Sequence, residues 1–470
     1  MSEPETPPGG NYAFLPHLLH LAVPIALQTF MMTALNFADT FMVGQLGEVA
    51  IGAIALGNQI FFVLMLLQFG VGGGGLVFSS QYWGRGDIRG VRRALGASLV
   101  FAFAGAGIFT LGAVLIPEAL LQLFTRDPRV VETGTPYLRI VGLSYLCTAV
   151  SMAYTHALRS IGNTKLPMYA TGISILLNIL GNYILIFGVF GFPALGVTGA
   201  AIATAIARLI EMGIILSVVY LRRSPVAASF RELTDWSAEF VKRFVRRASP
   251  VVANELLWAT GFTMYTVVFG RMGTSYLAAY NVADTVGRLL MVIFIATAQA
   301  TAVLIGNEIG AGRKSLAGQF GATIMHHVPI LAAVVGAAGF FLLAPVVPRL
   351  FSVGPEVQLL VRQFTRLFSL LLIIKTVNLH IIIGILRGGA DTTFALIIDI
   401  APLWLIGVPA AIVTGLVLDL PAQMVYIALN AEELTRLLFG WRRVRSGRWV
   451  HDITDGEKPQ LPGIEAAGAP

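Results

Sequence analysis

The pentapeptide VGQLG at residues 43–47 returns as FGRMG at residues 269–273, 226 positions later in the chain. Further along, LRSIGNT at residues 158–164 matches LRGGADT at residues 386–392 at a separation of 228 residues. A nearly constant offset over so much of the chain indicates an internal repeat. The sequence therefore predicts two related halves, joined by the basic segment 222–247.

The composition indicates the environment in which these halves fold. Of 470 residues, 56% are apolar and only 12% are charged, whereas soluble chains carry about 25% charged residues. This excludes a soluble enzyme, a disordered protein and a nucleic-acid-binding domain. The net charge of +7 is expected to mark the topology of a membrane protein in contact with lipid. A lone cysteine, Cys147, excludes an internal disulfide and a cysteine metal cluster.

Apolar stretches of membrane-spanning length divide the chain into twelve predicted spans. They cover residues 17–44, 50–82, 93–117, 135–158, 166–190, 196–221, 248–270, 276–308, 317–347, 358–385, 393–417 and 421–440. The last span is the weakest, because Ala-Glu-Glu-Leu at residues 431–434 interrupts it. The predicted domains are a cytoplasmic tail (1–15), an N-lobe (16–221), a cytoplasmic linker (222–247), a C-lobe (248–445) and a second cytoplasmic tail (446–470).

Each half contains six spans, an even number, so both halves enter and leave the membrane on the same side. The basic residues gather in the even-numbered connections and the C-terminal tail, which predicts that both termini are cytoplasmic in the inner membrane. The predicted fold is all-α, with two six-helix bundles related by a pseudo-two-fold axis along the membrane normal. Such parallel repeats around a central cavity are typical of transporters, whose halves rock to expose the cavity alternately.

Three motifs make the chain similar to a known family. NFADTFMVGQLG at 36–47, LRSIGNT at 158–164, GVTGAAIAT at 196–204 and the repeat of six spans resemble the multidrug and toxic compound extrusion (MATE) family. The resemblance implies a monomeric twelve-helix antiporter that exports organic, often cationic, compounds against inward movement of Na⁺ or H⁺. No other cofactor is expected.

Asp39 in the first span is the leading candidate for the coupling group. A charge at the centre of a membrane helix costs at least about 2.5–3.5 kcal/mol, so such a residue is a functional candidate by default. Gln28 lies on roughly the same helical face, whereas the repeat partner of Asp39 is Tyr265. The alternative is an interfacial aspartate that caps a loop.

Asn178 and Asn182 are four residues apart and face one direction on the fifth span. Their carbonyl oxygens and Asp39 would form an oxygen-rich cluster that suits a hard cation, which predicts an Na⁺ site. In one branch of the resembling family an aspartate of the first span joins an Asn, an Asp four residues later, and a Thr. Asn178 and Thr204 match that pattern, but Asn182 replaces the second Asp. One charge is therefore missing and proton coupling stays open, as does simple hydrogen bonding between helices.

A second candidate site, for substrate or a second cation, lies in the other half. It comprises Glu255, Trp258, Asn281, Asp284 and Asp399. A carboxylate with an aromatic side chain one turn later is typical of a site for a lipophilic cation. Asp284 has Arg288 at i+4, so a helix-surface ion pair is the alternative there. Asp399 has no cation nearby in the sequence and either binds a proton or marks a kink before Pro402.

Other classes of function fit the sequence less well. GVGGGG at residues 70–75 lies within an apolar span without a GK[ST] pattern, so it predicts close helix packing or a bend in the helix rather than a phosphate loop. With no nucleotide-binding signature, energy is expected to come from an ion gradient. A flippase for a lipid-linked precursor would need a more cationic cavity and extra spans. A lipid-modifying membrane enzyme would need a cytoplasmic cluster of His, Asp or Ser.

Overall fold

The computed structural model describes residues 14–350 and 353–454, and within these ranges the chain forms helices and no β-strand. The predicted tails 1–15 and 446–470 lie mostly outside the described residues. Helices of the first half are α1 (Phe14–Gly44), α2 (Glu48–Gly84), α3 (Ile88–Leu115), α4 (Pro117–Gln122), α5 (Pro128–Ser160), α6 (Lys165–Phe187) and α7 (Gly196–Leu221).

The second half contains helices of comparable length with several π-helical segments (η). Its elements are α8 (Phe230–Leu233), α9 (Ala238–Met272), α10 (Thr274–Gly310), α11 (Lys314–Ala338), η1 (Gly339–Leu343), α12 (Ala344–Val346), the 3₁₀ turn η2 (Val347–Leu350), α13 (Pro355–Leu379), η3 (His380–Leu386), α14 (Thr392–Pro402), η4 (Leu403–Gly407), α15 (Val408–Ile412), η5 (Val413–Val417), α16 (Ala422–Leu429) and α17 (Glu432–Arg445).

Each of the twelve predicted spans coincides with a helix or a continuous series of helical segments, which confirms the predicted fold class. Ten of the described helical stretches are long and apolar enough to cross a membrane by themselves. The other two are α9, whose first turns are basic, and the pair α16–α17. The latter pair is broken near Asn430 and carries Glu432, Glu433 and Arg436.

Local sequence signals explain where the helices begin and end. Asp87 caps α3 by accepting a hydrogen bond from the backbone N–H of Gly90 at 2.8 Å. Asp127 caps α5 in the same way, with Pro128 in the first helical position. Gly188 ends α6 in the left-handed conformation at φ 70°, which a residue without a Cβ adopts at no steric cost.

The described chain divides into two compact units. The N-unit comprises residues 27–252 with Thr454, and the C-unit comprises residues 14–26 with 253–453. The divisions fall two residues after Pro24 in α1 and two residues after Pro250 in α9, which are equivalent positions in the repeat. The first helix of each half therefore begins in the other half's unit.

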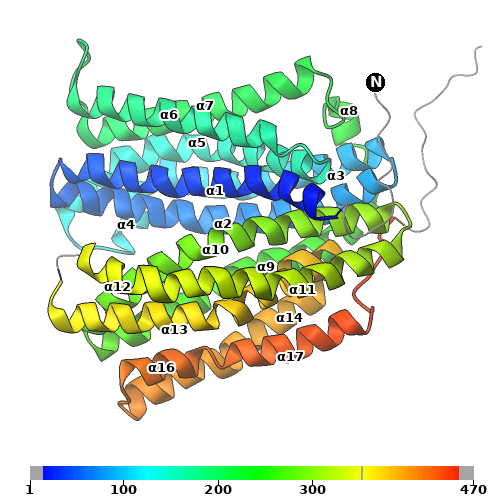
Figure 1. Ribbon diagram of the computed structural model, residues 1–470. Coiled ribbons are helices and arrows are strands. Elements are labelled where there is room, and N and C mark those ends of the chain that lie inside the picture. The colour runs from blue at the N-terminus through cyan, green and yellow to red at the C-terminus, as the bar shows by residue number, and fades with distance from the viewer. Residues whose placement is uncertain (1–13, 351–352, 455–470) are drawn as a thin grey trace, which may run out of the picture. The chain divides into compact units, whose positions relative to one another are not determined.

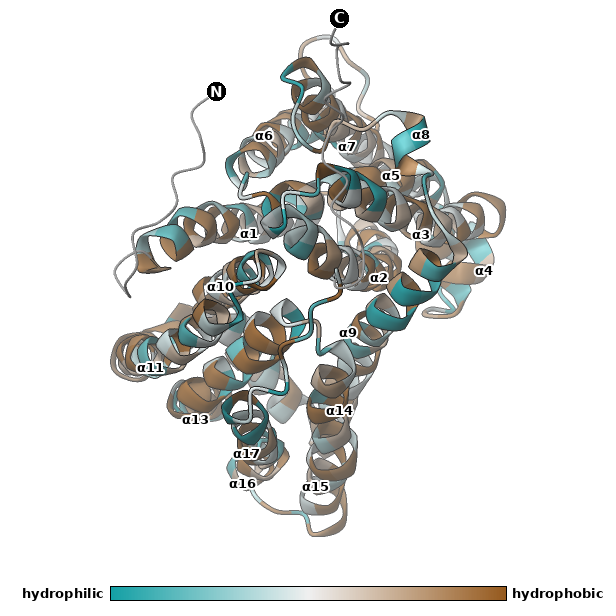
Figure 2. Ribbon diagram, turned by 90° about the vertical axis from the view of Figure 1, so that its right-hand side faces the viewer, coloured by the Kyte–Doolittle hydropathy of each residue, from teal (hydrophilic) through white to brown (hydrophobic). Residues whose placement is uncertain are grey.

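Within each unit the long helices pack side by side (Figure 1). In the N-unit, α2, α3, α5 and α7 contact one another and α6 packs on α7. Large apolar side chains remain exposed along the helices, and the ribbon is coloured hydrophobic over most of its length (Figure 2). On α3, Phe103 is 50% exposed, Ile108 71% and Leu111 60%. Contiguous apolar surface of this kind is what a lipid-facing helix presents.

The predicted linker 222–247 is more ordered than its composition indicates. Its last ten residues form the start of α9, and α8 carries a capping box made by Ser229 and Glu232. Arg92 of α3 forms an ion pair with Glu232 and donates from Nε to the carbonyl oxygen of Pro225 at 2.9 Å. Burial raises the pKa of Glu232, but hydrogen bonds from Ser229 and Arg92 outweigh it and lower the pKa overall.

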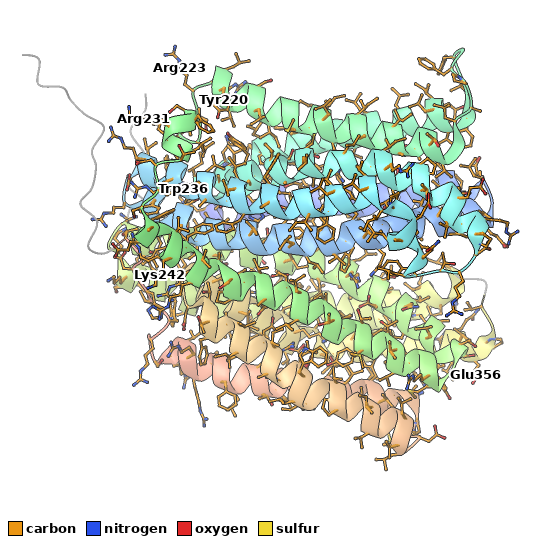
Figure 3. All side chains as sticks on the ribbon, turned by 180° about the vertical axis from the view of Figure 1, so that it is seen from behind. Tyr220, Arg223, Arg231, Trp236, Lys242 and Glu356 are labelled. Carbon is orange, nitrogen blue, oxygen red and sulfur yellow. The ribbon has the colours of Figure 1, made fainter. Side chains whose placement is uncertain are left out.

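The linker also brings basic side chains to one end of the N-unit. Arg223 and Arg231 project there near Tyr220 at the end of α7, and Lys242 projects from the first turns of α9 (Figure 3). The Tyr220 hydroxyl donates to the carbonyl oxygen of Ala228 at 2.9 Å and so fixes the connection to the helix. Figure 2 shows the same region, α8 and the first turns of α9, as hydrophilic.

Candidate functional site

The four residues predicted to couple a cation come together in the N-unit. The side-chain nitrogen of Asn182 on α6 donates to Asp39 Oδ1 on α1 at 2.7 Å and to Asn178 Oδ1 at 3.2 Å. The side-chain nitrogen of Asn178 donates in turn to the Thr204 hydroxyl on α7 at 3.2 Å. Both asparagines are buried. One hydrogen-bonded chain therefore links Asp39, Asn182, Asn178 and Thr204 across three helices.

Arg208 is a functional candidate that the sequence reasoning missed. It lies one turn after Thr204 on α7, and its charge acts on the Asp39 carboxylate. Its guanidinium pairs with Glu211 Oε2 at 3.0 Å and lies 5.8 Å from the centre of the Phe61 ring. Two charged residues within one apolar helix are the sequence signal that could have identified this pair.

A second polar chain continues from Glu211 toward α5. The Thr171 hydroxyl donates to Glu211 Oε1 at 2.7 Å and accepts from Gln28 Nε2 at 2.8 Å. Arg159 Nη2 donates to Gln28 Oε1 at 2.7 Å. The charges inside this unit are thus hydrogen-bonded or paired, as burial in a low-dielectric interior requires.

The N-unit residues fit a small hard cation in part. Na⁺ prefers oxygen ligands, and Asp39, Asn178 and Thr204 supply a carboxylate, an amide oxygen and a hydroxyl. Asn182 directs its nitrogen at Asp39, while its Oδ1 is buried without a hydrogen-bond partner among the described residues. A half-turn of this amide would present oxygen instead, because the two ends of an amide have nearly the same shape.

The second set of predicted residues does not form one site. Glu255 Oε1 pairs with Arg387 Nη1 at 2.8 Å. The Trp258 ring stacks on Phe262 with centroids 4.9 Å apart. Asn281 is exposed.

Two acids of this set have cationic partners in the C-unit. Asp284 pairs with Arg288 at 2.7 Å, the helix-surface ion pair that the spacing allowed. Asp399, which has no cation nearby in the sequence, acquires one in the fold. Arg436 on α17 reaches Asp399 Oδ1 at 3.3 Å and donates to the Asp399 carbonyl oxygen, while Asn254 donates to Oδ2 at 2.8 Å.

Glu432 and Glu433, the two acids of the stretch that the sequence presents as an interruption of the last span, belong to a buried polar cluster. Glu432 and Glu433 are 4% and 5% exposed. Arg436 Nη2 lies 3.4 Å from Glu432 Oε1, and Arg436 Nη1 lies 3.3 Å from Glu433 Oε1. Lys375 of α13 reaches Glu433 at 3.1 Å. The helix is interrupted between α16 and α17, at residues 430 and 431, and Lys375 and Arg436 pair with the acids that follow the interruption.

Comparisons with known proteins agree with the repeat and the fold. The family model MatE matches residues 24–184 and 250–413, two blocks that start 226 residues apart. The chain is 27% identical over 460 residues to the "Probable multidrug resistance protein NorM" of Geobacillus kaustophilus (strain HTA426), covering 94% of this chain and 98% of that protein. It is 25% identical over 441 residues to the NorM protein of Thermotoga maritima, described in the same words, covering 92% of each.

Solved structures share the same fold. An outward-facing multidrug resistance MATE family transporter of the MOP superfamily superposes with a TM-score of 0.83 at 19% identity, covering 92% of this chain and 96% of that chain. A MATE crystal structure in the bent conformation gives a TM-score of 0.84 at 20% identity, covering 93% and 96%. Because the sequence identity to these two structures is only 19% and 20%, the similarity establishes the fold alone.

Proposed function

We propose a function from the premise that this chain belongs to the MATE family of multidrug transporters. It is a secondary antiporter that exports small organic cations from the cytoplasm in exchange for H⁺ or Na⁺. It acts as a monomer in the inner membrane and needs no cofactor other than the coupling ion. Two lobes rock around a central cavity to alternate its access.

The observation that carries this proposal is the environment of Asp39. Its carboxylate is held by a neutral donor, the amide of Asn182, within a helix of membrane-spanning length. A carboxylate held in this way can take up and release a cation without first breaking a direct ion pair. Of the two ions, H⁺ is favoured, because the chain has an asparagine at position 182 and the Na⁺ site lacks a second charge.

The proposed cycle follows from the hydrogen bonds of Asp39. An incoming cation neutralises the carboxylate and removes its attraction for the Asn182 amide. The outer part of α1 is then free to repack, and this expels the substrate. After the return to the inward-facing state, the ion leaves and the bond from Asn182 to Asp39 forms again. Ion and substrate are coupled because they stabilise different states of the same equilibrium.

Two residues of the second set, Glu255 and Trp258 on α9, are assigned to substrate binding. Trp258 and Phe262 form a stacked aromatic pair, which a lipophilic cation can contact through its face. Glu255, three residues before Trp258 on the same helix, supplies a carboxylate, whereas Asn281, Asp284 and Asp399 do not gather with them. Because Arg387 already pairs with Glu255, an organic cation has to compete with a guanidinium for that carboxylate.

Transport in proteoliposomes tests the proposal. A fluorescent organic cation is followed while an Na⁺ gradient and a pH gradient are imposed separately. The Asp39→Asn variant should reduce gradient-driven transport to the level of empty liposomes, because it keeps the shape and hydrogen bonding of the side chain but removes its charge. The protein should remain folded and monodisperse.

The matched control is Asp419→Asn, the same chemical change at an exposed position with φ 47°, which Asn adopts readily. It should transport as the unmodified chain does. Normal gradient-driven transport by the Asp39→Asn variant would refute the role of Asp39. Transport by the unmodified chain with neither gradient as driving force would refute the antiport.

A further inference from the structure

The C-unit contains a counterpart of the Asp39 cluster, which becomes visible when the repeat is extended beyond residue 392. At the separation of 228 residues, Pro193 corresponds to Pro421 and Val197 to Val425. Arg208 then corresponds to Arg436. Helix α7 of the first half is therefore equivalent to α16 and α17 of the second.

Equivalent positions carry different chemistry in the two halves. The position of Asp39 is occupied by Tyr265, and the position of Thr204 by Glu432. The carboxyl group is therefore on the first helix in the first half and on the last helix in the second half. The arginine is the same in both: Arg208 acts on Asp39, and Arg436 contacts Glu432.

The hydrogen bond between Gln28 and Thr171 in the first half also has an equivalent in the second half. Gln28, which donates to Thr171, corresponds to Asn254, which donates to Asp399, and Thr171 itself corresponds to Asp399. The second half therefore has the same hydrogen-bonded framework with more acids in it. Helices α13, α14 and α17, which carry this framework, lie next to one another (Figure 1).

The charges of this buried cluster do not balance. Its described residues are three acids, Asp399, Glu432 and Glu433, and two bases, Lys375 and Arg436. All three acids are at most 8% exposed. If all five groups are charged, one negative charge remains inside a membrane domain, at a high desolvation cost. A single bound cation removes that cost.

The hydrogen bonds and ion pairs indicate which of the three acids binds this additional cation. Glu433 has three donors, namely Lys375, Arg436 and the amide of Asn378 at 2.8 Å. Asp399 has Arg436 and the amide of Asn254. Among the described residues, the one cation paired with Glu432 is the shared Arg436, through Oε1 at 3.4 Å. The least compensated carboxylate of the described cluster is therefore Glu432.

The second oxygen of Glu432 points at a position suited to a proton. Oε2 is buried without a hydrogen-bond partner of good geometry among the described residues, and so is the Tyr265 hydroxyl that faces this carboxylate. Both atoms lie close to Gly407 of η4. A Cβ added to this glycine would lie 2.1 Å from the Tyr265 hydroxyl and 2.6 Å from Glu432 Oε2. The tyrosine hydroxyl can both donate and accept, so it can accept a hydrogen bond from a proton on Oε2.

We propose that Glu432 is a proton-binding site of the C-unit, with Tyr265 as the hydrogen-bond partner of the bound proton. One H⁺ from water binds Glu432 Oε2, no other bond changes, and the charge of the cluster goes from −1 to 0. The charged or titratable groups facing this carboxyl are Glu433 and Arg436 on its own helix, Lys375 on α13, Asp399 on α14, Tyr265 on α9 and Tyr280 on α10. This site does not depend on the role proposed for Asp39.

Infrared spectroscopy of the purified full-length protein at neutral pH tests the site, because a protonated carboxyl has a carbonyl stretching band that a carboxylate lacks. The Glu432→Gln variant should lose one such band relative to the unmodified chain. The control Glu356→Gln, the same change at an exposed position, should lose none. Tyr265→Phe should keep the band but shift its frequency, since the hydrogen-bond partner is gone.

An unchanged carboxyl band in the Glu432→Gln variant would overturn the proposal. If that variant does not fold, Tyr265→Phe decides: a shifted band supports the site and an unshifted band overturns it. None of these measurements involves transport. A negative result with Asp39→Asn in the transport experiment therefore does not affect the infrared test of Glu432. A negative infrared result likewise does not affect the role proposed for Asp39.

Discussion

At the scale of single residues, the two units stabilise buried carboxyl groups in different ways. In the N-unit, Asp39 accepts a hydrogen bond from a neutral amide of Asn182. In the C-unit, the guanidinium of Arg436 is shared by three acids. A carboxylate held by neutral donors loses little when it binds a cation, whereas one in an ion pair loses that pair. This contrast is the reason for assigning ion coupling to Asp39 rather than to Asp399.

The Asn182→Asp variant should change the preference for the coupling ion. It places a second carboxylate where an amide nitrogen now lies 2.7 Å from Asp39 Oδ1. Two adjacent carboxylates repel each other unless a cation lies between them, and such a pair binds hard cations more strongly. The apparent Na⁺ affinity should rise about tenfold, equivalent to about 1.4 kcal/mol. It is measured as the Na⁺ dependence of transport in proteoliposomes at constant pH.

The control for this variant is Asn163→Asp. Asn163 is exposed and its Oδ1 accepts a hydrogen bond from the backbone N–H of Leu166 at 3.2 Å, which an aspartate can also accept. The control should leave the Na⁺ dependence unchanged. An equally unchanged Na⁺ dependence in Asn182→Asp would argue against cation binding between positions 39 and 182.

The residues also show how far the sequence predicts the site. The Asp39, Asn178, Asn182 and Thr204 cluster was predictable, because helical spacing and a family motif both indicated it. The partner of Asp399 was not, because Arg436 lies 37 residues away and the contact arises only when α14 packs on α17. Extending the repeat would have shown that Arg436 is equivalent to Arg208, but not which acids surround it.

At the scale of helices, the glycine-rich part of α2 allows other helices to approach closely. A Cβ on Gly70 would lie 2.5 Å from the backbone of Val252, and one on Gly74 would lie 2.7 Å from the backbone of Ala248. On other faces, Gly72 meets the His156 ring and Gly75 meets Ser98. The predicted close packing is confirmed. Glycine is required here because backbone atoms of α9 occupy the space of a side chain.

The Gly74→Ala variant should destabilise the protein by about 1–3 kcal/mol, the usual cost of inserting a methyl group into a well-packed region. The backbone of α9 cannot move aside as a flexible side chain would. Gly107→Ala is the control, because nothing lies within 4 Å of its Cβ position on α3. Thermal unfolding in detergent should show a lower Tm for Gly74→Ala and an equal or higher Tm for Gly107→Ala. Equal stability of Gly74→Ala and the unmodified chain would contradict the close approach.

The helix ends were predictable, whereas the irregular turns inside the helices were not. Apolar length and the breaks between spans determined the spans to within about five residues, except that α9 begins ten residues and α5 seven residues before the predicted start. The π-helical segments η3, η4 and η5 follow from packing and from prolines such as Pro402 and Pro409, whose rings exclude regular hydrogen bonds. Hydrophobic periodicity carries no signal for them.

At the scale of the whole molecule, the repeat accounts for both the likeness and the difference of the two halves. The duplicated framework includes the equivalent prolines Pro24 and Pro250 and the equivalent arginines Arg208 and Arg436. Within this framework, the first half has amides around Asp39, and the second half has acids around Arg436. Two units of the same architecture can thus hold two titratable carboxyl groups, Asp39 and Glu432, in unrelated surroundings.

The orientation of the molecule gives the last prediction. The segment 222–247 carries seven basic residues, whereas residues 189–196 carry no charge, and basic connections remain in the cytoplasm. After replacement of the lone Cys147 by serine, single cysteines are introduced as Arg222→Cys and Phe192→Cys, both at exposed positions. A membrane-impermeant maleimide added to intact cells should label position 192 and not 222, and should label both after the cells are opened. The reverse labelling pattern would mean that the protein has the opposite orientation in the membrane. The proposed uptake of the coupling cation by Asp39 from the outside would then be refuted.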